Sequence, residues 1–259
     1  MPADGCSSNP YINLSPGSDC TDSNPNIAPM HHLLLSLLLF ICLPAMAQDR
    51  YTYKGDDPNG IRKSYMGRQI AQVMSHWGID WLERPERDFE ENTTQLIRNL
   101  DIKSGMTVAD IGAGSGYHSR LLSKKVSNSR VYAVDVAPEM IEFLENRIQK
   151  EKISNITPIL GTEKSVNLPA ASTDLMLLVD VYHEFSFPYE MARSMHTALK
   201  PNGKLVLVEF RKEDDSVPIK MIHKMSEEQA VKEMKAAGFK LEKNISNLPW
   251  QHCMIFIKD

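Results

Sequence analysis

The sequence predicts an α/β fold built on a mainly parallel β-sheet. Between residues 107 and 210, short apolar runs alternate with segments whose apolar residues recur at helical spacing. Such alternation is typical of βαβ units, which place successive strands parallel in one sheet. The chain has 259 residues, of which 42% are hydrophobic and 24% are charged, so it is able to bury the core that this fold needs.

Short apolar runs mark the expected strands, and amphipathic segments mark the helices between them. Pro138 suits the first turn of a helix, and the stretch from Ser226 to Gln229 has the form of a capping box before a helix that Gly238 ends. The last two apolar runs, FKLEKNI and HCMIFIKD, predict an antiparallel pair at the sheet edge. In chain order, strands are expected at 107–112, 130–135, 156–160, 174–179 and 204–210, and helices at 117–126, 138–149 and about 188–199.

The region before the sheet is expected to be helical. After a polar lead-in, the spacing of Ile70, Val73 and Met74 predicts a helix over residues 61–76. A second helix is expected at about 88–100. We therefore divide the chain after its leader into an N-terminal helical segment, 48–90, and a main domain, 91–259.

An apolar run at residues 33–43 stands apart from this fold. It is too short to span a bilayer, which takes about 18 or more residues, and Ala45-Met46-Ala47 after it has the form of a signal-peptidase site. We interpret residues 30–47 as a signal peptide, preceded by a disordered leader at 1–29 that a true start at Met30 would explain. The expected location is the periplasm, with no stable membrane insertion after cleavage. An uncleaved anchor or a cytoplasmic location is the alternative, since no Lys or Arg precedes the run.

Charge and cysteine content exclude some classes of partner. The formal net charge is −4 and no basic patch dominates, so we expect no nucleic-acid partner. Cleavage after Ala47 would leave Cys253 as the only cysteine, which rules out an internal disulfide. The chain has no CxxC pair and no zinc-ligand spacing, so we expect no metal site. The oligomeric state stays open.

A glycine-rich turn follows the first expected strand, in the stretch ADIGAGSGYHS. Ligands of parallel sheets bind at the carboxyl ends of the strands, near the point where the strand order reverses. Gly112, Gly114 and Gly116 are spaced G-x-G-x-G, whereas a dinucleotide fingerprint would need glycine in place of Tyr117. Asp135, 23 residues after Gly112, ends the second strand, where an acid is able to accept hydrogen bonds from both hydroxyls of a ribose. These features favour a ribose-containing ligand other than NAD over a generic turn.

The fourth expected strand ends in VDVYHEF, which brings Asp180, His183 and Glu184 to the same sheet edge. They are either ordinary loop polarity or a catalytic edge. Asp180, at the very strand end, is expected to face the ligand that the glycine-rich turn binds. His183 is a candidate base because the ordinary pKa of histidine lies near 6.5. Glu209, which ends the fifth strand, is a candidate second acid, with a surface role as the alternative.

Four stretches together resemble successive motifs of the class I S-adenosylmethionine-dependent methyltransferases. They are VADIGAGSG, VYAVDVAPEMIEFL, LMLLVDVYHEF and LKPNGKLVLVEF, in the order of that family and within residues 90–259. The likeness is strongest to quinone-biosynthesis-type small-molecule methyltransferases and to exported bacterial methyltransferase-like proteins. It implies a Rossmann-like, seven-stranded, mainly parallel sheet with an antiparallel last strand, over which the N-terminal helices form a lid.

The resemblance also implies S-adenosylmethionine as the cofactor. Many relatives carry an acid after the third strand, where this chain has Thr162. Glu163 is expected to replace it at the adenine amino group. The implied cofactor contacts are Asp110, Gly112, Gly114, Gly116, Asp135, Val136, Glu163 and Asp180.

On the acceptor side, HEF at 183–185 resembles the HD-plus-aromatic stretch of plant phenolic O-methyltransferases, whose histidine is the base. His183 is expected to act as a base or to position the substrate, with Glu209 as a second catalytic candidate. Tyr65, Trp250 and His252 are expected substrate contacts. The alternatives for the last two are a core tryptophan and an exposed histidine.

The expected activity is methyl transfer to a small-molecule acceptor. A protein methyltransferase is an alternative because GSGYHS resembles the isoaspartate-repair type, although Gly161-Thr162-Glu163 replaces that family's Gly-Asp-Gly. A non-catalytic cofactor-binding module in the periplasm is the third possibility.

Overall fold

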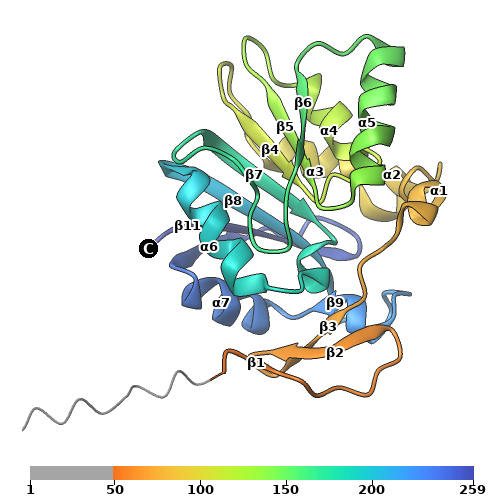
Figure 1. Ribbon diagram of the computed structural model, residues 1–259, viewed down its shortest axis with the longest axis vertical. Helices are drawn as coiled ribbons and strands as arrows, with labels where there is room; N and C mark the ends of the chain where they lie inside the picture. Colours follow the sequence, from red (N-terminus) through yellow and green to blue (C-terminus); the bar gives the residue numbers. More distant parts are fainter. Residues whose placement is uncertain (1–48) are drawn as a thin grey trace, which may run out of the picture. The chain divides into compact units, whose positions relative to one another are not determined.

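The computed structural model describes residues 49–259, which contain a central sheet and a small N-terminal sheet (Figure 1). The main path of the central sheet runs in the order β10-β11-β8-β7-β4-β5-β6, and the two-residue β9 pairs with β8 beside it. Its strands are β4 (Val108–Ile111), β5 (Val131–Asp135), β6 (Ile156–Leu160), β7 (Thr173–Val179), β8 (Leu199–Arg211), β9 (Lys224–Met225), β10 (Phe239–Asn244) and β11 (Gln251–Lys258).

The pairing confirms the predicted fold class. Strands β6, β5, β4, β7 and β8 pair in parallel, whereas β11 is antiparallel to both β8 and β10. The strand order reverses at β4, whose neighbours are β5 and β7. The carboxyl ends of these three strands therefore flank the switch point, where open α/β sheets bind their ligands.

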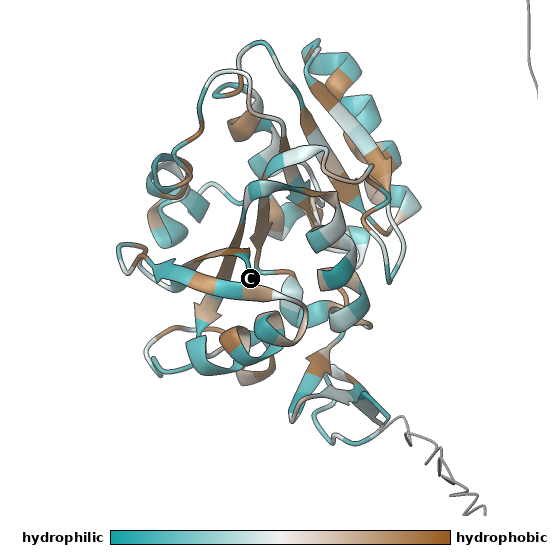
Figure 2. Ribbon diagram, turned by 90° about the vertical axis from the view of Figure 1, so that its left-hand side faces the viewer, coloured by the Kyte–Doolittle hydropathy of each residue, from teal (hydrophilic) through white to brown (hydrophobic). Residues whose placement is uncertain are grey.

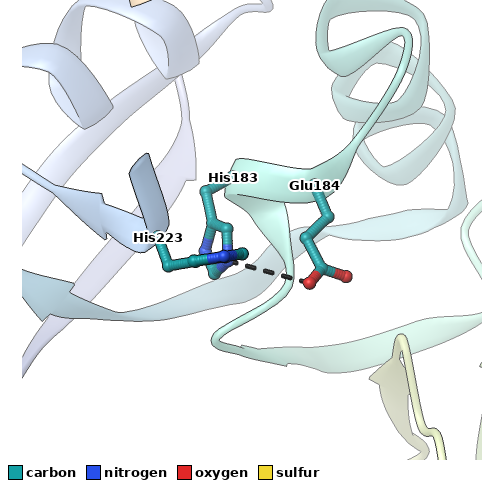
Figure 3. A group of neighbouring side chains, drawn as sticks. All are labelled: His183, Glu184 and His223. Carbon is teal, nitrogen blue, oxygen red and sulfur yellow. Dashed lines mark hydrogen bonds and ion pairs between the residues drawn. The ribbon is translucent and has the colours of Figure 1, made fainter. Parts of the chain in front are cut away.

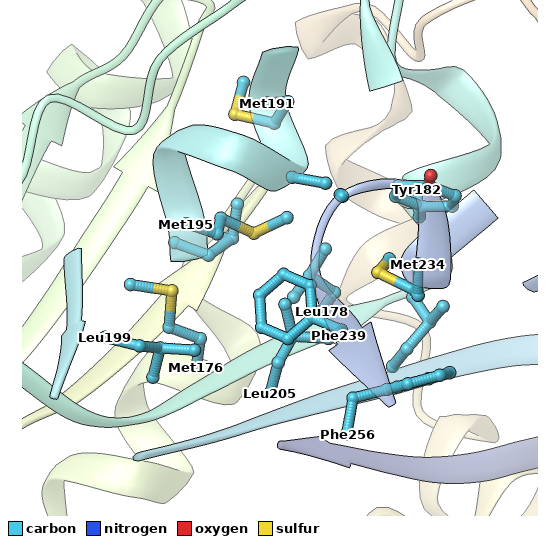
Figure 4. Close-up of a cluster of buried hydrophobic side chains, with 14 of the residues drawn as sticks. Met176, Leu178, Tyr182, Met191, Met195, Leu199, Leu205, Met234, Phe239 and Phe256 are labelled. Carbon is cyan, nitrogen blue, oxygen red and sulfur yellow. The ribbon is translucent and has the colours of Figure 1, made fainter. Parts of the chain in front are cut away.

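Helices cover both faces of the central sheet (Figure 1). Leu175 and Leu177 of β7 pack into a core with the helices of one face, α3, α4 and α5. Met176 and Leu178 point the opposite way, into a core with α6 and α7, which Figure 4 shows. Figure 2 shows the resulting hydrophobic strands within the sheet. The helices are α3 (Thr93–Asn99), α4 (Tyr117–Ser123), α5 (Pro138–Glu151), α6 (Pro188–Ala198) and α7 (Glu227–Ala236).

The helix expected over residues 61–76 is wrong. This stretch forms a hairpin of β2 (Gly60–Tyr65) and β3 (Arg68–Ala71), to which β1 (Tyr51–Thr52) adds a third strand. Met66 and Gly67 both take positive φ, 49° and 96°, as the two central residues of a type I′ hairpin turn do. Val73 and Met74, read as a helical face, lie beyond β3 and are 44% and 37% exposed.

The helix expected at 88–100 is divided in two. Asn92 takes a left-handed φ of 51°, which ends α2 (Arg87–Glu91) and begins α3. Its side chain accepts a hydrogen bond from the Gln95 amide at 3.1 Å, so Asn92 caps α3. Two short helical turns precede α2, the 3-10 turn η1 (His76–Gly78) and α1 (Ile79–Leu82). The predicted N-cap at Ser226 is confirmed, because its hydroxyl accepts from the Gln229 amide at 3.2 Å, whereas the Gln229 side chain donates to Met66 and Glu233 and does not complete a capping box.

The predicted signal segment, 30–47, and the leader, 1–29, lie outside the described residues. Within residues 49–259, no helix has the length and apolar character that a bilayer span requires.

A buried ion pair attaches the N-terminal hairpin to the central sheet. Arg68 of β3 forms a bidentate pair with Glu233 of α7, with distances of 2.8 and 2.9 Å. Its third contact is with the His183 carbonyl, to which Nη1 donates at 3.1 Å. That carbonyl belongs to η2 (Tyr182–Glu184), the 3-10 turn after β7. One guanidinium thus joins the hairpin, a covering helix and the loop at the switch point.

We predict that Arg68→Ala lowers the free energy of unfolding by about 3–5 kcal/mol, because it leaves the Glu233 carboxylate buried without its cation. Urea unfolding measures the change. Lys103→Ala is the matched control, since its pair with Asp101 is exposed and solvent screens its contribution to stability. Equal losses in the two variants would contradict this role of Arg68.

Candidate active site

A cavity of about 920 Å³, including its open mouth, lies at the switch point. The carboxyl ends of β4, β5 and β7 form its floor, and residues 73–82 of the N-terminal segment form another wall. We call it the donor cavity. Seven of the predicted cofactor and catalytic-edge residues line it: Gly112, Gly114, Asp135, Val136, Glu163, Asp180 and Glu184.

The glycine turn between β4 and α4 requires glycine for two reasons. Gly112 has a φ of +71°, a region that residues with a side chain rarely adopt. A Cβ on Gly112 would lie 2.3 Å from Cγ2 of Val181, another residue of the donor cavity. Gly116 begins α4 at a φ of +78° without lining the cavity. Glycine at position 112 therefore lets the turn pack closely against Val181, and Gly112 and Gly114 line the cavity.

Asp135 occupies the position predicted for the ribose acid. Its Oδ2 accepts from the Gly114 amide at 2.8 Å, and its Oδ1 accepts from the Ala137 amide at 3.0 Å. Burial raises the pKa of this carboxyl, while the amide hydrogen bonds act in the opposite direction. Each carboxylate oxygen keeps a lone pair, so Asp135 is able to accept two further hydrogen bonds from a vicinal diol.

The prediction for Asp110 is wrong in its direction. The buried side chain lies beneath the glycine turn and accepts a hydrogen bond from the Ser119 hydroxyl at 2.6 Å, and it lines neither cavity of this region. Burial raises its pKa to about 6, against the effect of the Ser119 hydrogen bond. Asp110 therefore attaches α4 to β4 instead of contacting a ligand.

Asp180 lies at the end of β7, in the wall between two cavities. It has a left-handed φ of 51°, a strained conformation that often marks functional sites. Its Oδ2 accepts from Gln251 at 3.2 Å, whereas Oδ1 is buried and has no partner among the described residues. Burial, and then the charges of Glu91 and Glu209, raise the pKa of Asp180 well above its usual value. A cationic group in either cavity would compensate the buried carboxylate of Asp180.

A second cavity of about 1090 Å³ lies on the other side of Asp180 and Glu184. We call it the acceptor cavity. Besides these two residues, its lining combines aromatic and charged side chains from three parts of the chain: Trp81, Arg87, Glu91, His183, Phe210, Lys220 and His223. The pair Arg87–Glu91 is buried, with a distance of 3.0 Å between Nε and Oε2.

His183 and Glu209 form a buried pair at the edge of the acceptor cavity. Their Nδ1 and Oε2 atoms are 2.6 Å apart, and Oε1 of Glu209 accepts from the Tyr182 amide at 2.8 Å. Burial lowers the pKa of His183, but the Glu209 carboxylate outweighs it, and the net shift is upward. The other ring nitrogen, Nε2, lies 3.1 Å from Nδ1 of His223, and Figure 3 shows the two rings with Glu184 beside them.

None of the three predicted substrate contacts lines either cavity. Tyr65 is buried in the N-terminal hairpin, with its ring 5.4 Å from that of Tyr51. Trp250 lies outside both linings, with its ring 6.5 Å from Phe210. His252 is buried in β11 and bonded to Asn244 and Glu213, at 2.9 Å each.

Sequence reasoning missed His223, Arg87 and Glu91. His223 belongs to η3 (Met221–His223), which follows an irregular loop after β8. No periodicity marks that loop, so only the fold brings His223 to His183. The i,i+4 spacing of Arg87 and Glu91 indicates their pairing but gives no sign of a cavity.

Comparison with known proteins agrees with this geometry. A family model described as "Methyltransferase domain" matches residues 102–252. Among curated relatives, the protein-L-isoaspartate O-methyltransferase of Pyrococcus horikoshii is 27% identical over 137 residues, which cover 48% of this chain and 59% of that protein. An uncharacterized methyltransferase of Bacillus subtilis is 27% identical over 143 residues, which cover 55% of this chain and 76% of the relative.

The similarity to solved structures concerns the fold. A SAM-dependent methyltransferase from Aquifex aeolicus superposes with a TM-score of 0.67 at 23% identity, over 71% of this chain and 98% of that structure. The Pyrococcus horikoshii protein PH0226 gives a TM-score of 0.58 at 16% identity, over 72% and 100%. With the family match over more than half of its length, the chain belongs to the methyltransferase-domain family of class I S-adenosylmethionine-dependent methyltransferases.

Proposed function

We propose that this protein transfers the methyl group of S-adenosylmethionine to a small-molecule acceptor. The observation that carries the proposal is the common wall of the two cavities, in which Asp180 and Glu184 line both. A methyl donor in one cavity and an acceptor in the other would meet across this wall. Such placement contributes most of the catalysis in methyl transfer, because the reaction is an in-line displacement.

The residues of the donor cavity fit S-adenosylmethionine. Asp135 offers two oxygens to the ribose hydroxyls, and Gly112 and Gly114 line the cavity beside it. Glu163 and Val136 line the same cavity, and we propose that they contact the adenine. The unpartnered Oδ1 of Asp180 suits the ammonium of the methionyl group. When bound, the cofactor supplies an electrophilic methyl group on a sulfonium.

The lining of the acceptor cavity supports a compact acceptor. Trp81 and Phe210 supply apolar surface, and Arg87 with Glu91 closes one side. His183 is only 2% exposed, so an acceptor must enter the cavity to reach it. The Glu209 carboxylate fixes the proton on Nδ1 and directs the Nε2 lone pair of neutral His183 toward this region.

A protein acceptor is the second candidate, since curated relatives act by name on protein L-isoaspartate. An isoaspartyl side chain would have to extend a backbone into the acceptor cavity. Methylation of an isoaspartyl peptide, and of none in a panel of phenols, catechols and quinols, would favour it over our proposal.

Asp135→Ala should weaken binding of S-adenosylmethionine by about 100-fold or more, because two charge-assisted hydrogen bonds are lost. Isothermal calorimetry with S-adenosylmethionine and S-adenosylhomocysteine measures it. Asp174→Ala is the matched control, since Asp174 lies near the opposite end of β7 and pairs with Lys200 at 2.7 Å. If the native protein binds neither ligand, the enzyme proposal fails.

His183→Ala should leave cofactor affinity unchanged and lower turnover by roughly 10²–10⁴-fold. Transfer of radiolabelled methyl from S-adenosylmethionine to the acceptor panel gives the rate. His196→Ala serves as the control, because His196 lies on α6 beside Phe239, with ring centroids 5.2 Å apart. Unaltered turnover in His183→Ala would rule out a part for His183 in acceptor activation.

We further propose export to the periplasm, which the apolar run at 33–43 and the Ala45-Met46-Ala47 site support. N-terminal sequencing of the protein from a periplasmic fraction should give a chain that begins at Gln48. Peptides from residues 1–29 in the mature protein would contradict both the cleavage and the start at Met30.

A further inference from the structure

His183, Glu184 and His223 form a cluster at the wall between the two cavities (Figure 3). One ligand-type atom from each residue lies within 4.8 Å of the others. Two of them come from η2 and the third from η3, which enters 40 residues later in the chain. We propose that this cluster binds a divalent transition-metal ion.

The two imidazoles are already close to the separation that a common metal ion needs. Nε2 of His183 and Nδ1 of His223 are 3.1 Å apart, and their rings are inclined by 81°. Two nitrogens, each about 2.0–2.1 Å from a metal, would be roughly 2.9–3.4 Å apart in octahedral or tetrahedral geometry. Oε1 of Glu184 is 3.9 Å from Nε2 of His183, so a shift of about 1 Å would complete the set.

The surroundings of His183 match those of a metal-binding histidine. A carboxylate is only able to accept, so the contact of Glu209 places the proton of neutral His183 on Nδ1. This leaves the Nε2 lone pair, which faces Nδ1 of His223 at 3.1 Å, available for a ligand bond as in carboxylate–histidine–metal arrangements. Glu209 is fully buried and is itself held by the Tyr182 and His183 amides at 2.8 and 3.3 Å. The ring orientation is therefore fixed before any ion binds.

The balance of buried charge also favours a cation. Asp180, Glu184 and Glu209 are carboxylic residues near His183, and none of them has a salt bridge to Lys or Arg in the described part of the chain. The two buried arginines of this region are already paired, Arg87 with Glu91 and Arg68, which donates to the His183 carbonyl, with Glu233. Buried acids are rarely left without a compensating charge. Two imidazoles and a carboxylate suit Zn²⁺, Co²⁺ or Fe²⁺, and leave coordination positions open toward the acceptor cavity.

The inference deepens the proposed function, on which its catalytic meaning rests. A cation at this wall would lower the pKa of an acceptor hydroxyl and favour acceptors with two adjacent oxygens, such as catechols. In the transfer, an acceptor oxygen would form a bond to the methyl carbon while the carbon–sulfur bond breaks. Sulfur would keep the bonding electron pair as a neutral thioether, and the hydroxyl proton would pass to solvent.

The rival explanation is a proton shared between His183 and His223, which also brings two imidazole nitrogens to about 3 Å. Metal titration separates the two cases. The full chain, freed of any affinity tag and dialysed against chelator, is titrated with Zn²⁺ by calorimetry and with Co²⁺ by visible absorption. We expect one ion per chain at the cluster and a Co²⁺ ligand-field band.

His223→Ala and His223→Gln should weaken Zn²⁺ binding by more than about 100-fold, since loss of a ligand costs more than the roughly 10–100-fold of an outer partner. Glu209→Gln should weaken Zn²⁺ binding by only about 10–100-fold, because Glu209 orients His183 and is not itself a ligand. His196→Ala should bind like the native protein, and the far-ultraviolet circular dichroism of each variant checks its folding. Equal affinity in the native protein and both His223 variants, or no binding at all, would overturn the metal site. The metal titrations contain neither cofactor nor acceptor. A failure to bind metal would therefore say nothing about S-adenosylmethionine binding, which calorimetry tests separately.

Discussion

The carboxylate of Glu209 determines the conformation of the site. It lies on β8 with no exposed surface, and it accepts hydrogen bonds from the backbone of the neighbouring loop and from His183. Without these donors a buried carboxylate would cost several kcal/mol, so the loop and the charge stabilise each other. Asp180 and Glu184, which form the wall between the cavities, lie at the two ends of that loop. The hydrogen bonds of Glu209 to the loop therefore also fix the position of the wall.

The central sheet and the donor cavity were predictable from the sequence because their signals are local. A strand buried on both faces is apolar throughout, and a turn that takes positive φ next to packed side chains requires glycine. Asp135 follows directly from its place at a strand end. The sequence did not predict the direction of the Asp110 side chain. It points toward Ser119 of α4, and only the packing of α4 on the sheet reveals that partner.

The N-terminal hairpin and the acceptor cavity depend on long-range contacts. Three apolar residues at helical spacing gave the wrong element, since the turn at Met66-Gly67 and the pairing of Arg68 with α7 outweigh local propensity. His223 has no neighbouring pattern and becomes significant only when η3 packs against η2. Tyr65, Trp250 and His252 line neither cavity, because the sequence alone does not fix which way a side chain points.

The last strand has a consequence for the order of folding. Strand β11 lies between β8 and β10 and pairs with β8 from Gln251 to Ile257, so that Glu209 lies opposite His252. During synthesis, the edge of β8 stays unpaired on this side until residues 251–257 have left the ribosome. Contacts of this long sequence separation form slowly, and an open strand edge favours aggregation. A chain truncated before β11 should therefore lack the strand that flanks Glu209 and accumulate as an aggregation-prone intermediate.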